Sequence, residues 1–359
     1  MADAIITEYV PMITEASIEN FKGIKHCEVK DLAKVNLFIG KNNCGKSSIM
    51  EAMYYTGKEF IGTNLLQCLT RRAARGNWSA RELWYDYDMS PNINVALGFN
   101  EQNFAEMTVA FSPQEDRVAV LLGSGSPKYG KRKGQLCLYS KTGFGLATGR
   151  SHVEILSPNP REILQYFDRS VFIDPTVKTE VRQIEGIYLN VLKLSEKASS
   201  EMAKRVAEVY DTEPSWEFLP HQDYSPDNPS RFAVLEGGRR LFVDNFGDGF
   251  HYGLAVLAAA KTRTKTALFI EEIESHQHSG SLSKLIRHLV RISRDNNLQV
   301  FLSTHSMDVW ETLHRGVYAD DEAKEKEEFR CFLIEKNVET GEVTSENTYD
   351  VQKITKALE

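Results

Sequence analysis

The order of apolar and polar residues predicts strands that alternate with helices near both ends of the chain. Residues 12–39 read as strand, turn and strand, ending in the apolar run VNLFIG. Residues 46–60 read as a helix. In residues 266–306, two apolar strands flank the helical segment LSKLIRHLVRIS, and RCFLIEK follows as a late strand. Continuous apolar strands alternating with helices predict a largely parallel sheet.

The middle of the chain shows two other patterns. Short alternating strands separated by Gly- and Ser-rich turns occupy residues 92–149, which is typical of an antiparallel sheet. Between residues 179 and 210, apolar residues recur every three or four positions, which predicts an amphipathic helix or a helix pair. A continuous helix would be an arm about 45 Å long; the alternative is a helix packed on the surface. RFAVL and GGRRLFV then read as a hairpin with a Gly-Gly turn.

Composition and charge narrow the class of protein. The chain has 359 residues, 42% of them hydrophobic, and a formal net charge of −7, whereas dedicated nucleic-acid binders are usually basic. Its densest basic cluster, KYGKRK at residues 128–133, reads as a solvated loop or as a local patch. There is no run of about 18 apolar residues, and the acidic N-terminus does not resemble a secretory signal. We therefore expect a cytoplasmic protein without a membrane partner.

The most specific motif is the phosphate-loop sequence GKNNCGKS at residues 40–47, between an apolar strand and a helix. Its two glycines let the backbone turn tightly and aim N–H groups at a phosphate. Lys46 is predicted to reach the β- and γ-phosphates, and Ser47 to ligate Mg²⁺. The residues of this segment predicted to bind nucleotide are Gly40, Asn42, Asn43, Cys44, Gly45, Lys46, Ser47 and Ser48.

The five cysteines do not indicate a disulfide framework or a metal site. None of the five cysteines forms a C-x-x-C pair, so neither a disulfide framework nor a cysteine zinc site is expected. Within the phosphate loop, Cys44 is either a small residue that fits the turn or an oxidation-sensitive thiol near a helix N-terminus.

Two carboxylates stand at the end of a later apolar strand. The sequence ALFIEE, residues 267–272, is a Walker B pattern. Glu271 is predicted to hold Mg²⁺ with Ser47, directly or through water, and Glu272 to polarise the water that attacks the γ-phosphate.

Two further segments carry candidate chemistry. His305, in STHS directly after the strand LQVFL, is predicted to contact the γ-phosphate or to position the attacking water. The sequence NFGDG at residues 245–249 precedes a helix, so its N–H groups form a second anion site. The residues predicted to bind nucleotide there are Asn245, Gly247, Asp248 and Gly249. The predicted catalytic residues are Lys46, Glu272 and His305.

The order of these motifs resembles that of ABC-type ATPases rather than AAA+ motors. The chain looks like the ATPase domain of the OLD, RecF and SMC proteins, and most like short AAA family ATPases related to OLD. The matching segments are IENFKGI, GKNNCGKSSIMEAM, DNFGDGFHYGL, LFIEEIESHQH and FLSTHS. Because the chain ends soon after STHS, we do not expect the Toprim nuclease domain of OLD proteins. It also has no C-x-x-C hook and no long coiled coil.

This resemblance implies an α/β fold of the ABC-ATPase P-loop type, with a mostly parallel core sheet, an N-terminal antiparallel β subdomain and a helical insertion. We expect an N-terminal lobe at residues 1–175, with the phosphate loop and the β-rich subdomain. A helical insertion or arm would follow at residues 176–235. The C-terminal lobe, residues 236–359, would hold the signature, Walker B and the histidine.

The resemblance also implies ATP and Mg²⁺ as ligands, and hydrolysis to ADP and phosphate. In the family, the signature of one subunit contacts the γ-phosphate bound by another, which implies a head-to-tail homodimer or a higher homo-oligomer. Residues 245–249 stand at the signature position. ESHQHS, residues 274–279, matches the D-loop, which crosses the dimer interface. The alternative for His276 and His278 is a zinc pair.

Three functions stay open from the sequence. The first is an ATPase that controls a separate nuclease or toxin effector in phage defence or DNA repair. The second is an ATP-gated DNA clamp of the RecF/SMC type. Its candidate DNA contacts are Arg71, Arg72, Arg75 and residues 128–133. The third, a transporter nucleotide-binding domain, is disfavoured by the FGDG signature and the β-rich middle.

Overall fold

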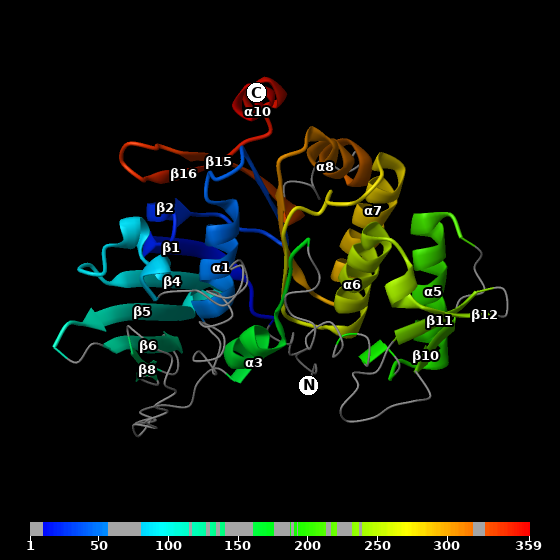
Figure 1. The fold of residues 1–359 in the computed structure, drawn as a ribbon, viewed down its shortest axis with the longest axis horizontal. Helices are drawn as coiled ribbons and strands as arrows, with labels where there is room; N and C mark the ends of the chain where they lie inside the picture. Colours follow the sequence, from blue (N-terminus) through cyan, green and yellow to red (C-terminus); the bar gives the residue numbers. More distant parts are fainter. Residues whose placement is uncertain are drawn as a thin grey trace, which may run out of the picture. The chain divides into compact units, whose positions relative to one another are not determined.

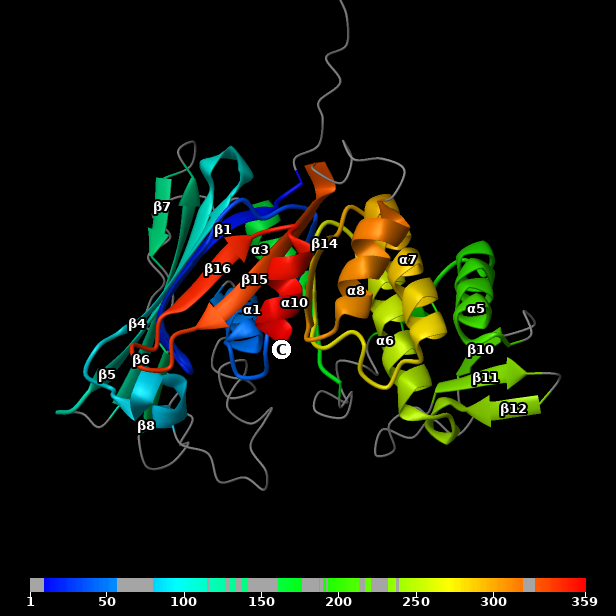
Figure 2. The same cartoon turned by 90° about the horizontal axis from the view of Figure 1, so that it is seen from above.

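The protein divides into two compact units, which a computed structural model describes (Figures 1 and 2). Unit 1 comprises residues 1–32, 51–170 and 337–343, and unit 2 comprises residues 33–50, 171–336 and 344–359. Each unit is made of several separate segments of the sequence, whereas the predicted division has three consecutive parts, residues 1–175, 176–235 and 236–359. The three-part division therefore stays a prediction. The structure describes residues 10–56, 80–114, 117–126, 130–133, 137–140, 161–175, 187, 190–191, 193–212, 217–220, 232–236, 239–318 and 327–359.

Unit 1 is built on an antiparallel sheet with the strand order β2-β1-β4-β5-β6-β7, in which β8 also pairs with β6. Along β4 every second residue is buried, as the alternating sequence predicts. The predicted antiparallel β subdomain is therefore confirmed. The strands are β1 (Ile13–Phe21), β2 (Ile24–Val29), β4 (Ile93–Phe99), β5 (Phe104–Ser112), β6 (Arg117–Ser126), β7 (Gly130–Lys133) and β8 (Cys137–Ser140). The short helices are η2 (Ala80–Leu83), η3 (Tyr85–Tyr87), η4 (Asn100–Gln102) and α3 (Arg161–Arg169).

Unit 2 contains a six-stranded sheet with the order β16-β15-β3-β14-β13-β9. The pairs from β15 through β3, β14 and β13 to β9 are all parallel. Every residue of β3, β9, β13 and β14 is buried, which explains their uninterrupted apolar sequences. The mostly parallel core sheet is confirmed. Its strands are β3 (Val35–Ile39), β9 (Val171–Ile173), β13 (Ala267–Ile270), β14 (Gln299–Thr304), β15 (Phe329–Lys336) and β16 (Val343–Asn347).

Helices pack on this sheet in layers. Helix α6 contacts β13 and β9, and α5 and α7 contact α6 (Figure 1). Seven consecutive residues of α6, LAVLAAA, are buried, so the helix is apolar all round. The helices of unit 2 are α5 (Glu196–Tyr210), η5 (Val243–Asn245), α6 (Asp248–Thr262), α7 (Ser279–Asp295), α8 (Met307–Glu311), the π-helix η6 (Thr312–Val317) and α10 (Val351–Leu358). Helix α1 (Lys46–Thr56) begins in residues assigned to unit 2.

Of the two alternatives for residues 179–210, a single helix or a helix pair, the structure contradicts the single helix, although most residues before 193 lie outside the described ranges. A turn at Lys193 and Leu194 separates the helical residues before it from α5, which begins at Glu196. The Ser195 side chain caps α5 by accepting from the N–H of Ala198. The 45 Å arm is therefore wrong, because this cap starts a new helix. Helix α5 packs against α6 and α7, which is the surface-helix alternative.

A small antiparallel sheet accompanies α5. It comprises β10 (Glu217–Pro220), β11 (Phe232–Glu236) and β12 (Arg239–Phe242). The pairing of β11 with β12 confirms the predicted hairpin, although its Gly-Gly turn lies outside the described residues. None of the helices in the described part of the chain combines the length and the apolar character needed to cross a bilayer.

Candidate active site

The carboxyl ends of four neighbouring parallel strands bring the predicted residues to one edge of the unit 2 sheet. The last residue of β3 pairs with the last residue of β14, and the last residue of β13 pairs with the last residue of β9. Loops that follow parallel strands meet at the same edge, which is where such sheets bind ligands. The residues that directly follow the four strands are Gly40, Asp174, Glu271 and His305.

The tight turn of the phosphate loop depends on two glycines, Gly40 and Gly45. A Cβ at Gly40 would lie 2.3 Å from the backbone oxygen of Ile334 in β15, so only glycine fits there. Gly45 has a φ of 108°, which glycine adopts readily. Asn43 also has a positive φ, 62°. The backbone thus turns sharply between β3 and the first turn of α1, where free N–H groups favour an anion.

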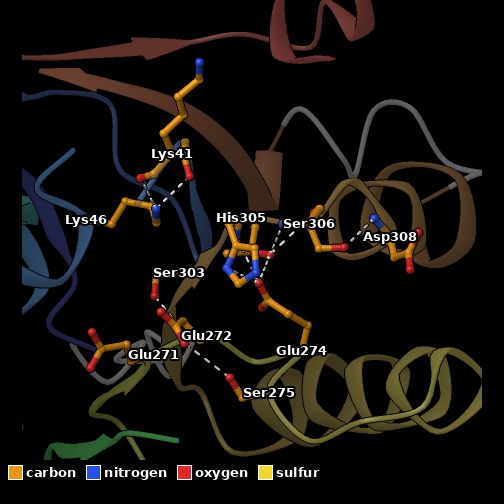
Figure 3. A network of polar contacts seen from close by, with 12 residues as sticks. Lys41, Lys46, Glu271, Glu272, Glu274, Ser275, Ser303, His305, Ser306 and Asp308 are labelled. Atoms are coloured by element: carbon orange, nitrogen blue, oxygen red, sulfur yellow. Dashed lines mark hydrogen bonds and ion pairs between the residues drawn. The ribbon is translucent and has the colours of Figure 1, made fainter. Parts of the chain in front are cut away.

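Lys46 folds back over this loop. Its Nζ donates to the backbone oxygens of Gly40 and Lys41, both at 2.7 Å, and the residue is only 7% exposed (Figure 3). Among the described residues, no carboxylate pairs with this ammonium group. A phosphate entering the loop would therefore meet a cation that is not already neutralised.

Cys44 belongs to the packing of the loop. Its side chain is buried, and burial raises the pKa of the thiol although Lys46 acts in the opposite direction. A thiol held in its protonated form reacts slowly with oxidants. This favours the interpretation of Cys44 as a small residue that fits the turn.

Ser47 and Glu271 lie together. The Ser47 hydroxyl donates to Oε1 of Glu271, which is 4% exposed. The backbone of Glu271 is held on both sides, since its N–H donates to Ile173 at 2.8 Å and its carbonyl accepts from the Tyr252 hydroxyl at 2.5 Å. Hydroxyl and carboxylate oxygens are the ligands that Mg²⁺ prefers, and it takes its other ligands from phosphates and water. The pair therefore fits a Mg²⁺–nucleotide complex.

Glu272 has a different environment from its neighbour Glu271. Its φ is 48°, an uncommon conformation for a non-glycine residue that costs about 1–2 kcal/mol. The backbone N–H donates to the Ser303 hydroxyl at 3.0 Å, and Oε2 accepts from the Ser275 hydroxyl at 3.3 Å (Figure 3). These two contacts hold the half-buried carboxylate at the end of β13.

His305 is bound to a carboxylate that we did not assign from the sequence. The backbone N–H of His305 donates to Oε1 of Glu274 at 2.9 Å, and the ring nitrogen Nδ1 of His305 lies 3.2 Å from the same oxygen. In sequence, Glu274 was only the first residue of the D-loop match. Glu274 and His305 are 31 residues apart, so the sequence does not show that they are in contact. They meet because they follow the neighbouring strands β13 and β14.

A second group missed in the sequence is Tyr252, whose buried hydroxyl lies in the field of several carboxylates. Burial raises its pKa well above the usual value, and the negative charges of nearby carboxylates raise it further. Those carboxylates belong to Glu274, Glu271, Asp174 and Glu272. An anionic triphosphate would be repelled by this edge of the sheet unless Lys46 and a divalent cation offset the negative charge.

The predicted signature segment contacts the residues that follow Walker B. A Cβ at Gly249 would lie 2.2 Å from the backbone oxygen of His276. The Gly249 carbonyl accepts from the side chains of Tyr210 and Gln277, at 2.8 and 2.6 Å. Asn245, Gly247 and Asp248 are exposed. Their backbone groups and side chains are thus open to a ligand or partner.

The zinc alternative for His276 and His278 gains no support. Within the described ranges, no group of three or more His, Cys, Asp or Glu residues is placed to hold a metal ion. Nδ1 of His278 instead accepts from the N–H of Gly280 at 3.4 Å, at the start of α7.

Two family models match separate parts of the chain. The model described as "AAA ATPase domain" matches residues 12–121. The model described as "AAA domain, putative AbiEii toxin, Type IV TA system" matches residues 141–309. Together they include the phosphate loop, Walker B and His305.

Individual proteins and one solved structure are also similar to this chain. A Helicobacter pylori protein named ATP/GTP phosphatase is 21% identical over 352 residues, which are 89% of this chain and 92% of that protein. The DNA replication and repair protein RecF of Vibrio parahaemolyticus is 27% identical over 131 residues, 36% of this chain and 33% of RecF. A crystal structure of an Smc head bound to the C-winged helix domain of ScpA has a TM-score of 0.49 at 12% identity, covering 95% of this chain and 99% of that one.

The narrower likeness to OLD proteins stays a prediction, since the matched families and relatives are described in other terms. The two AAA matches and the RecF relative agree with a phosphate loop and a Walker B strand in one parallel sheet. The chain is thus similar to ABC-like ATPases of the RecF type, and its parallel sheet has the ABC-ATPase P-loop fold.

Proposed function

We propose that this chain binds ATP together with Mg²⁺ and hydrolyses it to ADP and phosphate. The observation that carries the proposal is the meeting of the predicted residues at one edge of the unit 2 sheet, where the parallel register of β3, β14 and β13 ends. The residues proposed to act there are Lys46, Ser47, Glu271, Glu272 and His305.

Each residue has a role that follows from its chemistry. The N–H groups of the phosphate loop and the Lys46 ammonium bind the β- and γ-phosphates. Ser47 and Glu271 would hold Mg²⁺, which supplies positive charge beside the phosphate oxygens. Glu272 accepts a proton from the attacking water as its oxygen bonds to the γ-phosphorus. The bond from the γ-phosphorus to the bridging oxygen breaks, and ADP leaves with the electron pair.

We also propose that two copies close on two nucleotides in a head-to-tail dimer, or in a higher homo-oligomer built from such pairs. The signature segment supports this, because its residues Asn245, Gly247 and Asp248 are exposed at the start of α6, where a helix N-terminus suits an anion held by a second chain. A Cβ at Gly247 would meet nothing within 4 Å, so the backbone there is accessible.

The biological role proposed is control of a separate nuclease or toxin effector, in phage defence or DNA repair. A family description that names a toxin system supports it. The purified chain is incubated with DNA and Mg²⁺ or Mn²⁺. We expect no cleavage by the chain alone, and strong cleavage would contradict a separate effector.

The RecF relative favours one alternative, an ATP-gated DNA clamp. Its candidate contacts Arg71, Arg72 and Arg75 lie outside the described residues, and of residues 128–133 only the strand β7 is described. A clamp would bind DNA with ATP and release it as salt rises. ATP-bound protein without salt-sensitive DNA binding would exclude this alternative.

The enzymatic proposal is tested with Lys46→Ala. Binding of ATP and of GTP is measured by calorimetry, and phosphate release is measured with and without Mg²⁺; GTP is included because the Helicobacter pylori relative is named for both nucleotides. Lys34→Ala is the matched control, since Lys34 lies before β3, at the opposite edge of the sheet. We expect Lys46→Ala to weaken binding at least about tenfold. Undiminished hydrolysis in Lys46→Ala, or wild-type protein that binds neither nucleotide, would overturn the proposal.

A further inference from the structure

One oxygen of Glu274 accepts two hydrogen bonds at the end of β14 and lies beside a ring nitrogen of His305. Oε1 accepts from the Thr304 hydroxyl at 2.8 Å and from the His305 N–H at 2.9 Å, and it lies 3.2 Å from Nδ1 of His305 (Figure 3). The Glu274 side chain is 12% exposed and the His305 side chain 48%. The carboxylate is thus held in the protein, while much of the imidazole stays accessible.

The contact with Glu274 decides which ring nitrogen of His305 carries a proton. A carboxylate can only accept, so Nδ1 must donate to it. In the other neutral tautomer, the lone pair of Nδ1 would face the negative oxygen. The proton on Nδ1 leaves Nε2 as the ring atom available for a ligand or a water molecule.

The second oxygen of Glu274 makes no hydrogen bond to another part of the described chain. Oε2 is buried and, in the described part of the chain, has no hydrogen-bond partner. A buried carboxylate oxygen without a donor is unfavourable. Within the described residues, the hydrogen bonds of this side chain come from the Thr304 hydroxyl and the His305 backbone N–H, and both end on Oε1.

We propose that Glu274 is a positioning residue that holds His305 with its proton on Nδ1 and presents Nε2 to the γ-phosphate end of the nucleotide. The inference rests on the proposed function, because it assigns His305 to the same reaction. Neutral His305 offers the lone pair of Nε2 to a water molecule. Protonated His305 donates from Nε2 to phosphate, while Nδ1 keeps its contact with Glu274.

A purely structural role for Glu274 is the competing explanation. The same turn is already stabilised by other hydrogen bonds: the Ser306 N–H donates to the Thr304 hydroxyl at 2.9 Å, and the Ser306 side chain caps α8. If Glu274 only stabilised this turn, its loss would lower the melting temperature without changing the imidazole tautomer.

The test is Glu274→Gln in the full chain, compared with Glu328→Gln. Glutamine keeps the shape but loses the charge, and its amide can donate to Nδ1, which allows the other tautomer. Glu328 also holds one partner, Arg294 at 2.7 Å, but it precedes β15 at the opposite edge of the sheet. Long-range ¹⁵N–¹H NMR of the histidine rings at pH 8 reports the tautomer, with His305→Asn used to assign the signal.

We expect a proton on Nδ1 of His305 in the wild type and in Glu328→Gln, and a proton on Nε2 or a mixture in Glu274→Gln. We expect kcat for ATP to fall about tenfold or more in Glu274→Gln, with a smaller change in KM. An unchanged tautomer, or unchanged kcat with only a lower Tm, would overturn the inference.

Two further results keep this test distinct from that of the proposed function. If the wild type hydrolyses neither ATP nor GTP, the proposed function fails, whatever the tautomer of His305. If Glu274→Gln does not fold, Glu274→Asp replaces it. Aspartate keeps the charge but is too short to keep the contact with Nδ1, so an ordered wild-type tautomer and unchanged kcat in that variant would also overturn the inference.

Discussion

The hydroxyl of Ser47 donates a hydrogen bond to the carboxylate of Glu271, although the two residues stand 224 positions apart in the sequence. Ser47 lies in the first turn of α1, which follows β3, and Glu271 directly follows β13. Strand β14 lies between β3 and β13 in the sheet. The order of the strands therefore creates the pair of oxygen ligands.

We expect Ser47→Ala and Glu271→Gln each to raise the Mg²⁺ concentration needed for half-maximal hydrolysis by about tenfold or more, because each removes one oxygen ligand. Combining the two changes should have less effect than the sum of both, because they act at one site. The measurement is phosphate release across a Mg²⁺ titration. Ser293→Ala is the control, since this buried hydroxyl donates to the Leu289 carbonyl within its own helix, away from the strand ends. An unchanged Mg²⁺ requirement in both single variants would contradict the assignment.

Glu272→Gln should separate binding from hydrolysis. The variant keeps the phosphate loop and Lys46, so we expect it to bind ATP as the wild type does. It lacks the carboxylate that accepts the proton of water, so hydrolysis should slow by about 10²- to 10⁴-fold. Light scattering after gel filtration with ATP should then show a stable dimer. Hydrolysis at the wild-type rate would remove Glu272 from the mechanism, and Glu335→Gln, an exposed residue of β15, provides the control.

Gly249 and Gly247 differ in the space around them, which predicts different effects of alanine. At Gly249 a Cβ would meet the backbone oxygen of His276 at 2.2 Å, so α6 and the segment after β13 must separate. We expect Gly249→Ala to destabilise the monomer by about 1–3 kcal/mol. Gly247→Ala has open space and should leave the melting temperature unchanged, yet weaken ATP-dependent dimerisation. Equal melting temperatures for the two variants would contradict this difference.

Unit 1 holds a buried ion pair between Lys22, in the turn of the β1–β2 hairpin, and Glu51 of α1. Nζ of Lys22 lies 2.6 Å from Oε2 of Glu51, whose side chain is 1% exposed. Lys22→Met would remove the cation that pairs with this buried carboxylate, so we expect a loss of about 3 kcal/mol in the free energy of unfolding. Urea denaturation measures it. Lys30→Met breaks the exposed pair with Glu28 and should have little effect, since solvent already screens both charges. A similar loss of unfolding free energy in both variants would contradict the prediction that the buried ion pair contributes more stability than the exposed one.

The main strands and the motif positions could be predicted from the sequence for a local reason. The apolar runs in β3, β13 and β14 are long enough to indicate buried parallel strands. The chemical groups stand directly after those runs, where a strand must end in a loop. Position along the chain therefore sufficed to find Lys46, Glu271, Glu272 and His305 as candidates.

Two features could not be predicted in this way. The start of α5 depends on the Ser195 cap and the turn before it, which interrupt a helical periodicity that otherwise continues. The role of Glu274 depends on Thr304, the last residue of β14, and on His305, which follows it. The pattern of apolar and polar residues along one segment does not show which residues of another segment it will contact.

The sequence by itself determined the residue types at the strand ends, the glycine turn of the phosphate loop and the likeness to ATPases of known type, because these follow from short segments of chain. Only the tertiary structure decided that Ser47 meets Glu271 and that His305 meets Glu274. The physical reason is that parallel strands need long connections, so neighbours in the sheet are distant in sequence. The order β3-β14-β13 then selects which side chains share one edge.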